Sequence, residues 1–225
     1  MSSSFDHYIN GTLMTYFNRL LEFFGPQYWW PGDTPFEVII GAILTQNTTW
    51  KNVEKSIAIL KQHDLLDPKI LRSISQDELA QLIRSCGYYN QKAKKISHFL
   101  QFFECHYQSD IERMRQEPLD RLRNQLLTVH GIGPETADSI LLYAMSKQVF
   151  VIDSYTRRIF SRHNLIDPDA DYETLRLFFE NNLKKELYLF NEYHALIVCT
   201  GKDFCRTKKP LCQQCPLKEL LPNKS

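Results

Sequence analysis

The sequence has no long hydrophobic run. No stretch of its 225 residues approaches the roughly 18 successive apolar residues that a membrane-spanning helix needs. The N-terminus also lacks a basic segment followed by an apolar one, which is the pattern of a secretory signal. These absences favour a soluble, intracellular protein, and a cytoplasmic location is the expectation. The length allows one large domain or two small ones.

The chain also has no large excess of positive or of negative charge. The 27 Lys and Arg residues oppose 26 Asp and Glu residues, which leaves a net charge of +1. The chain is therefore no polycation, and any binding of nucleic acid must depend on local basic patches and backbone amides. Hydrophobic residues make up 43% of the chain and charged residues 24%, which is ordinary for a globular protein.

Strand-like segments are almost absent. Residues 149–152 form the only β-like run, which is too short and solitary to found a sheet. Elsewhere apolar residues recur every three or four positions and predict amphipathic helices, some opened by capping motifs such as Thr34-Pro35-Phe36-Glu37. The sequence therefore predicts an all-α fold. The expected helices cover approximately residues 9–24, 35–44, 50–60, 76–86, 92–106, 119–127, 135–145, 154–160, 172–185 and 188–199.

Two glycines interrupt the helical pattern. Gly131 and Gly133 lie between two predicted helices, and Pro134 stands at the start of the second. Glycine permits a left-handed turn and a close approach by a ligand, and the amides at the start of a helix attract phosphate. An ordinary turn between two helices is the alternative. The wider string Leu-Leu-Thr-Val-His-Gly-Ile-Gly-Pro-Glu-Thr-Ala-Asp, followed by Asp153, is more specific than the glycines alone.

Tryptophan is scarce, and the three tryptophans fall in two short segments. Trp29 and Trp30 precede Pro31, and Trp50 follows a polar Gln-Asn pair closely. Indole faces stack on flat ligand rings, and they attract cations more strongly than other aromatic side chains do. The clustering beside polar residues favours a ligand-binding pocket. A place in the hydrophobic core is the alternative.

Residues 126–158 resemble the helix-hairpin-helix and the Gly/Pro-rich loop followed by aspartate that define the endonuclease III superfamily. The resemblance implies a two-lobed helical fold with an active-site cleft between the lobes, one formed by residues 29–142 and the other by residues 1–28 and 143–225. It also implies that Asp153 is the catalytic carboxylate, which stabilises the sugar cation or primes a water molecule as the glycosidic bond breaks. Fixed negative charge beside an oxocarbenium-like transition state fits that role. A role as a helix N-cap is compatible with it.

Four motifs together look most similar to the 3-methyladenine DNA glycosylases of endonuclease III type: Trp-Trp-Pro, Leu-Thr-Gln-Asn-Thr, Gly-Tyr-Tyr-Asn-Gln-Lys-Ala-Lys and Val-His-Gly-Ile-Gly-Pro-Glu-Thr-Ala-Asp. This resemblance covers most of residues 28–198. It implies a base excision repair enzyme that binds double-stranded DNA with a damaged base and removes an alkylated purine. The implied base pocket consists of Trp29, Trp30, Pro31 and Trp50. Gln46 matches the residue that wedges into the gap left by the flipped base. A monomer associated with the nucleoid is expected.

One position departs from the bifunctional members of the superfamily. They carry a lysine in the second helix of the hairpin, and Glu135 stands at that position here. Without an amine there is no Schiff base with the abasic sugar, so the expected enzyme is monofunctional. Two rivals stay open. The first is a mismatch thymine or uracil glycosylase, whose base pocket would need hydrogen-bond partners more than indoles. The second is a non-catalytic protein that binds damaged DNA through the hairpin and does not need Asp153.

Four of the six cysteines lie in the last 27 positions, which is not the distribution of a disulfide framework. Cys205-x6-Cys212-x2-Cys215 matches three positions of the superfamily's [4Fe-4S] loop, Cys-x6-Cys-x2-Cys-x5-Cys, but the fourth position is Leu221. Such clusters are held by four thiolates. Cys199 could substitute, although its place at the end of an apolar helix predicts that it is buried. The sequence leaves open whether the loop still holds a cluster.

Two basic segments are candidates for contact with DNA phosphate. Lys92 belongs to a group of lysines at the start of a predicted helix, and Lys208 lies in the basic C-terminal tail. With Gln46, Gly131 and Gly133 they make up the predicted DNA-binding set. A solvated helix face is the alternative for the segment around Lys92.

Overall fold

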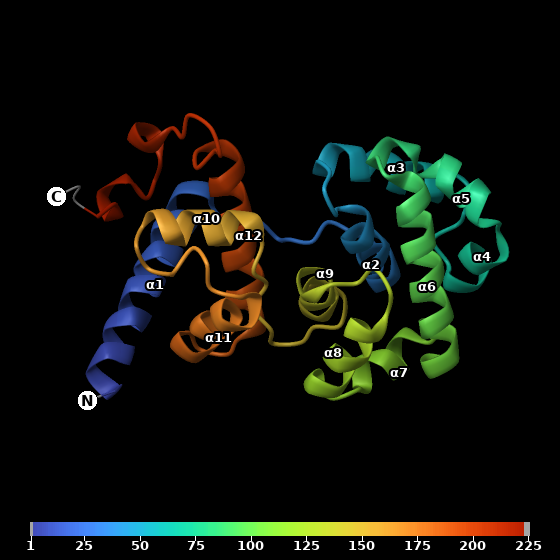
Figure 1. Cartoon of the computed structure of the whole chain (residues 1–225), viewed down its shortest axis with the longest axis horizontal. Coiled ribbons are helices and arrows are strands. Elements are labelled where there is room, and N and C mark those ends of the chain that lie inside the picture. The colour runs from blue at the N-terminus through green and yellow to red at the C-terminus, as the bar shows by residue number, and fades with distance from the viewer. Residues whose placement is uncertain (1, 223–225) are drawn as a thin grey trace. The chain divides into compact units, whose positions relative to one another are not determined.

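The computed structural model describes residues 2–222 (Figure 1). The predicted all-α fold is confirmed, because these residues form helices, turns and loops without a strand. None of the described helices combines the length and the apolar content that crossing a membrane requires. The α-helices of this range are α1 (Ser2–Phe24), α2 (Pro35–Leu44), α3 (Trp50–Gln62), α4 (Pro68–Ser73), α5 (Gln76–Leu82), α6 (Tyr89–Tyr107), α7 (Ile111–Gln116), α8 (Leu119–Thr128), α9 (Pro134–Ser139), α10 (Ser154–Arg162), α11 (Tyr172–Asn182) and α12 (Leu187–Asp203). The shorter helices are η1 (Arg84–Cys86), η2 (Ile140–Ala144), η3 (Cys212–Gln214) and η4 (Lys218–Leu220), of which η2 is a π-helix.

The chain divides into two compact units. The first contains residues 1–29 and 148–225, and the second contains residues 30–147. The predicted domain of residues 1–28 and 143–225 includes residue 1 and residues 223–225, which lie outside the described residues. The segment 143–147, which the sequence assigned to the first unit, belongs to the second. The reason is that η2 continues directly from α9 and packs against both α9 and α2.

An aromatic core holds the first unit together. In this unit α12 packs against α1 and α10, and α1 also contacts α11 (Figure 1). Phe150 stacks on Phe179 with ring centroids 4.3 Å apart, and Phe160 meets Phe179 edge-on at 4.9 Å. Phe190 meets Phe150 edge-on at 5.4 Å, and all four rings are fully buried. Because aromatic side chains bury large apolar areas, this cluster forms a firm base for the segment that leads to Asp153.

The β-like run at residues 149–152 forms neither a helix nor a strand with any described residue, and all of it is buried. Buried backbone amides need hydrogen-bond partners. The amide of Phe150 donates to the Glu180 carboxylate at 3.0 Å, and the amide of Ile152 donates to the Tyr172 hydroxyl at 3.3 Å. Side chains of α11 therefore hold this segment in the way that a neighbouring strand would, and they fix the point where α10 begins.

Helix α2 forms the centre of the second unit. All of its residues after Pro35 are buried, and it contacts α3, α6, α9 and η2. The predicted N-terminal cap is confirmed, because the Thr34 hydroxyl accepts a hydrogen bond of 3.1 Å from the amide of Glu37. In a standard capping box the glutamate carboxylate accepts a hydrogen bond from the amide of the N-cap residue. Here the Glu37 carboxylate accepts instead from the amide of Asp33, one residue earlier, at 3.1 Å.

The hairpin falls where the sequence predicts it. Helix α8 ends at Thr128 and α9 begins at Pro134. Between them Gly131 has a φ of +94°, in the left-handed region that favours glycine. The Arg123 guanidinium of α8 donates to both carboxylate oxygens of Asp138 in α9, at 2.6 and 3.0 Å, and both side chains are buried. A forked pair of this kind fixes orientation as well as distance, so the two arms of the hairpin are held as one unit.

Candidate active site

Asp153 is the N-cap of α10, as the sequence predicts. Its Oδ1 accepts hydrogen bonds from the amide of Thr156 at 2.7 Å and from the Thr156 hydroxyl at 2.8 Å. Only 9% of Asp153 is exposed. The start of the helix therefore fixes one oxygen of this carboxylate, and Oδ2 is left for a different partner.

His194 of α12 is that partner. Its Nε2 lies 3.5 Å from Oδ2 of Asp153, and its side chain is buried. Burial raises the pKa of Asp153, but the contact with His194 and the hydrogen bonds from Thr156 outweigh it and lower the pKa below its ordinary value. The carboxylate therefore carries its negative charge at neutral pH although it is almost excluded from water. A charged and rigidly held carboxylate can stabilise positive charge that develops beside it.

Trp30 and Trp50 line one cavity in the second unit, which we call the tryptophan cavity. Their ring centroids are 5.2 Å apart and the rings are nearly perpendicular, at 88°. Pro31 lines the same cavity, whose volume is about 210 Å³. Trp30 also contacts Tyr143 at 5.2 Å and covers Gly41, where a Cβ would lie 3.3 Å from the indole Nε1. Both indoles remain partly exposed. The structure thus brings three of the four predicted pocket residues together.

Acidic side chains complete the lining of the tryptophan cavity. Glu37, Glu54 and Lys61 line it as well. The Lys61 ammonium lies 2.8 Å from the Glu37 carboxylate and 2.7 Å from the Asp33 carboxylate, so these two acids neutralise it. Glu54 is exposed and leaves the lining with a surplus negative charge. Trp29, the fourth predicted pocket residue, is half-buried in the first unit and does not line this cavity.

Gln46 contacts the hairpin directly. Its amide nitrogen donates to the Gly131 carbonyl at 3.1 Å and to the Thr136 hydroxyl at 2.9 Å, and its amide oxygen accepts from the Lys95 ammonium. The Lys95 side chain passes so close to Gly131 that a Cβ there would lie 2.4 Å from its Cγ. Gly131 is therefore needed for its close contact as well as for its φ. At Gly133, by contrast, a Cβ would meet no described atom within 4 Å, so this glycine borders open space.

The structure corrects the interpretation of Lys92. Only 2% of this residue is exposed, and its ammonium donates to the carbonyls of Leu44 at 2.9 Å and of Cys86 at 2.7 Å. Burial lowers the pKa of Lys92. The amine thus binds backbone carbonyls in the interior of the second unit and is not accessible to phosphate. Lys208 is exposed in the C-terminal loop, as a contact with phosphate requires.

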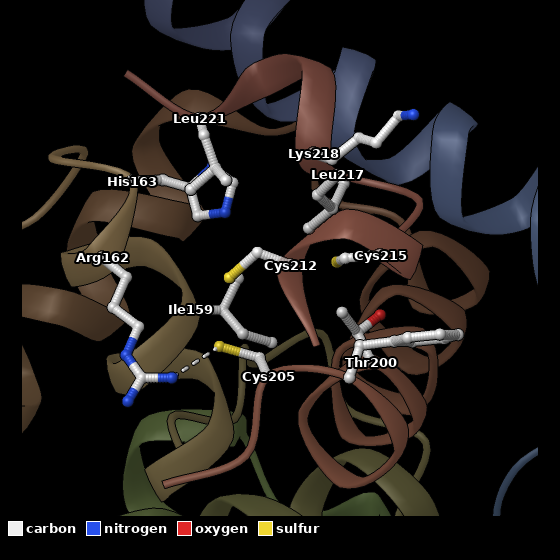
Figure 2. Close-up of a pocket in the computed structure, with 11 residues that line it drawn as sticks. Ile159, Arg162, His163, Thr200, Cys205, Cys212, Cys215, Leu217, Lys218 and Leu221 are labelled. Atoms are coloured by element: carbon white, nitrogen blue, oxygen red, sulfur yellow. Dashed lines mark hydrogen bonds between the residues drawn. The ribbon is translucent and has the colours of Figure 1, made fainter. Parts of the chain in front are cut away.

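The C-terminal loop borders a second cavity, which lies within the first unit and which we call the thiol cavity (Figure 2). Cys205, Cys212 and Cys215 line it together with Leu221, and its volume is about 30 Å³. Burial raises the pKa of the Cys215 thiol, and the proximity of Cys205 and Cys212 raises it further. Three of the four positions of the [4Fe-4S] pattern therefore line one partly open cavity, and the fourth is a leucine.

Protein contacts hold this loop in place. On α10, Arg158 donates to the Cys205 carbonyl at 2.6 Å, and Arg162 donates to the Cys205 sulfur at 3.3 Å. Cys199 is not part of the thiol cavity, because its thiol donates to the Gln27 side chain at 3.2 Å. Within residues 2–222 no group of three or more His, Cys, Asp or Glu side chains surrounds the position of a single metal ion.

The family profile described as "HhH-GPD superfamily base excision DNA repair protein" matches residues 40–185, a span that includes the hairpin and Asp153. The chain belongs to this superfamily. A Methanocaldococcus jannaschii protein named "Putative DNA repair glycosylase MJ1434" is 48% identical over 207 residues, which cover 91% of this chain and 93% of that protein. The chain is accordingly a DNA repair glycosylase of the HhH-GPD superfamily.

Solved structures agree with this membership. The Helicobacter pylori 3-methyladenine DNA glycosylase MagIII, solved with 1,N6-ethenoadenine, is 32% identical and has a TM-score of 0.71, with 88% of this chain and 97% of that chain covered. A trapped endonuclease III–DNA covalent intermediate has a TM-score of 0.80 and covers 94% of each chain. Its identity is 21%, so that likeness concerns the fold alone.

Sequence reasoning missed His194, Glu54 and Lys95 in this glycosylase. A polar residue in the apolar stretch of α12 was the available signal for His194. Glu54 follows Trp50 by one helical turn, so the helical repeat already placed both on one face of α3. Lys95 stood in the lysine-rich segment, but only the packing of α6 tells which of these lysines meets the hairpin.

Proposed function

We propose that this glycosylase removes alkylated purines of the 3-methyladenine type from double-stranded DNA. The observation that carries the proposal is the tryptophan cavity, in which Trp30 and Trp50 lie edge to face and Glu54 adds a negative charge. Indole faces and a carboxylate attract a cation, and a purine becomes cationic when it is alkylated on the ring. The 32% identity to MagIII, whose structure holds 1,N6-ethenoadenine, supports a purine as the substrate.

Asp153 acts at the sugar in this proposal. As the bond between the sugar and the base breaks, its electron pair neutralises the alkylated base, and positive charge develops on the sugar ring. A carboxylate that is already charged and already held by Thr156 needs no rearrangement to stabilise that charge. Water then adds to the sugar carbon and loses a proton, and an abasic site remains.

We propose further that the enzyme is monofunctional. Glu135 is exposed on α9 at the position where bifunctional members have a lysine, and a carboxylate forms no Schiff base. Treatment with borohydride should therefore trap no covalent protein–DNA adduct, and strand breaks should appear only after alkali. A strong trapped adduct would show that another amine of the chain attacks the sugar.

Backbone and side chains near the hairpin are the proposed DNA contacts. The open space at Gly133 lets a phosphate approach the backbone, and Gln46 lies beside Gly131 and Thr136. To fill the gap left by a flipped base, Gln46 would have to exchange its bonds to the hairpin for bonds to DNA. Lys208 is the proposed contact in the C-terminal loop. A single chain provides all these groups, so we propose a monomer that acts on chromosomal DNA.

We also propose that Cys205, Cys212 and Cys215 hold an iron–sulfur cluster. The support is that all three thiols line one cavity, with the Arg162 guanidinium next to the sulfur of Cys205. A cluster spreads its irons over several ångströms, so its thiolates need not surround one point. When bound, such a cluster would tie the end of α12 to the C-terminal loop. No step of base removal is assigned to it.

The deciding experiment uses duplex DNA treated with a methylating agent, and released bases are separated and identified by chromatography. We expect 3-methyladenine to be released by the native chain and not by Asp153→Asn. Duplexes with a G·T or a G·U mismatch test the rival glycosylase in parallel. Release of thymine or uracil without any alkylated purine would refute the proposal, and binding of damaged DNA without release of any base would favour the non-catalytic rival.

A further inference from the structure

We infer that His163 is the fourth protein ligand of the iron–sulfur cluster, in place of the cysteine that this chain lacks. The inference rests on the cluster proposed above. Leu221 lines the thiol cavity but has no donor atom, so three thiols alone would leave one iron without a protein ligand. His163, at the C-terminal end of α10, lines the same cavity and offers an imidazole nitrogen, a common ligand of transition metals.

His163 lies at the corner of the cavity that the missing cysteine would serve. Its Nδ1 is 3.2 Å from the carbonyl oxygen of Leu220, the residue directly before Leu221. The Tyr16 hydroxyl lies 2.8 Å from the same nitrogen and donates to the Leu220 carbonyl at 3.2 Å. Figure 2 shows the His163 ring and Leu221 together at one end of the cavity. An imidazole thus stands beside the backbone that would carry the fourth thiolate.

The hydrogen bonds of His163 leave the correct nitrogen for a metal. With the hydrogen on Nδ1, the ring donates to the carbonyl of Leu220, which can only accept, and the Tyr16 hydroxyl donates to the same carbonyl. The neutral ring then carries its lone pair on Nε2. In Figure 2 this second ring nitrogen points to the side on which the sulfur atoms of Cys212 and Cys205 lie. Histidines that bind metals typically donate their other N–H to a backbone carbonyl or a carboxylate in this way.

A histidine with only a structural role would predict something different. Such a residue would join α1 to the C-terminal loop through Nδ1, and substitution would change stability without touching the cluster. A ligand, in contrast, is detected by the cluster itself. Neutral imidazole in place of thiolate also makes the site less negative, which raises the reduction potential. These two consequences separate the roles without any measurement of base release.

The test uses the full chain, reconstituted with iron and sulfide without oxygen and labelled with ¹⁵N-histidine. We expect about four irons per chain, and we expect pulsed EPR of the reduced cluster to detect coupling to a histidine nitrogen. His163→Cys should keep the iron, lose the nitrogen coupling and lower the reduction potential. The control His106→Gln replaces an exposed histidine of α6 and should leave the coupling and the potential unchanged.

Each part of the inference fails separately. If the native chain binds no iron, the cluster and the ligand assignment both fall. If it binds iron without histidine coupling, or if His163→Ala keeps the same iron content and spectrum, the cluster stands and His163 is not its ligand. Base release is measured on the same preparations. Its absence from a preparation that shows the nitrogen coupling would count against the proposed glycosylase activity and would leave the ligation intact.

Discussion

His194 should control the charge of Asp153, and its removal gives a sharp prediction. The Nε2 of His194 lies 3.5 Å from Oδ2 of Asp153, and this contact is the largest of the influences that lower the pKa of the carboxylate. His194→Leu keeps a side chain suited to the buried site and removes the donor. The pKa of Asp153 should therefore rise, and the acidic limb of the pH–rate profile should move to higher pH.

The size of the effect on rate follows from the geometry. A hydrogen bond to a charged group contributes about 1.5–3 kcal/mol, and the separation of 3.5 Å is long for such a bond. The lower end of that range is the most that the loss of this contact can cost, and it corresponds to a loss of at most about tenfold in the rate of base release at neutral pH. Since His194 is a positioning residue that acts through Asp153, this loss should depend on the carboxylate being present.

Single-turnover release of 3-methyladenine between about pH 3 and pH 8 is the assay, because the lowered pKa of Asp153 places the native acidic limb at low pH. Melting temperature is measured alongside. His194→Gln retains an N–H donor and serves as the matched variant, which should recover most of the rate. In the Asp153→Asn background, His194→Leu should cost nothing further, because the interaction it removes is already gone. A native rate and an unshifted acidic limb in His194→Leu would refute the reasoning, as would a full tenfold loss in the Asp153→Asn background.

Other predictions follow from the same contacts. Asp153→Asn keeps the N-cap but should slow base release by about 10²- to 10³-fold, with binding to damaged DNA retained in a filter or anisotropy assay. The pKa of Asp153 is lower in the folded chain than in the unfolded one, so its charge stabilises the fold above the unfolded pKa of about 3.9. The difference in free energy of unfolding between the native chain and Asp153→Asn should therefore become smaller as pH falls below that value. Trp50→Ala removes a wall of the tryptophan cavity and should raise the activation free energy of single-turnover base release by about 1–3 kcal/mol. The loss should be larger for 3-methyladenine than for neutral hypoxanthine. Equal losses on both bases, together with a large drop in melting temperature, would assign Trp50 to the hydrophobic core. Arg123→Met should destabilise the fold by about 3–5 kcal/mol in urea titration, because it leaves the Asp138 carboxylate buried without its partner; Arg123→Met with Asp138→Leu should recover much of this, and a single variant of native stability would contradict the argument.

The parts of the structure that local sequence controls could be predicted from it. The cap at Thr34, the N-cap at Asp153 and the break between α8 and α9 each depend on a few neighbouring residues, and all three are confirmed. The all-α fold followed from the periodicity of apolar residues for the same reason. The π-helix η2 was not expected, because its residues show the same apolar spacing as an ordinary helix.

The parts that depend on distant segments could not be predicted. Lys92 has a polar head on a long aliphatic chain, and its sequence neighbours are lysines, so the pattern predicted a solvated or DNA-facing amine. Only the fold brings the carbonyl of Leu44 within 2.9 Å of that amine. The contact between Asp153 and His194 likewise joins the start of α10 to α12. Pairs of this kind leave no periodic signal, and a single sequence does not reveal them.

The placement of Glu135 has a consequence for how enzymes of this fold change their chemistry over evolution. The four residues that follow it, Thr136 to Ser139, are buried, and Asp138 among them joins the two helices of the hairpin. Glu135 itself is exposed. The position to which we assign the difference between monofunctional and strand-cutting enzymes thus lies on the exposed face of α9. A lineage can therefore exchange an amine for a carboxylate here in a single substitution that leaves the buried residues of α9 unchanged.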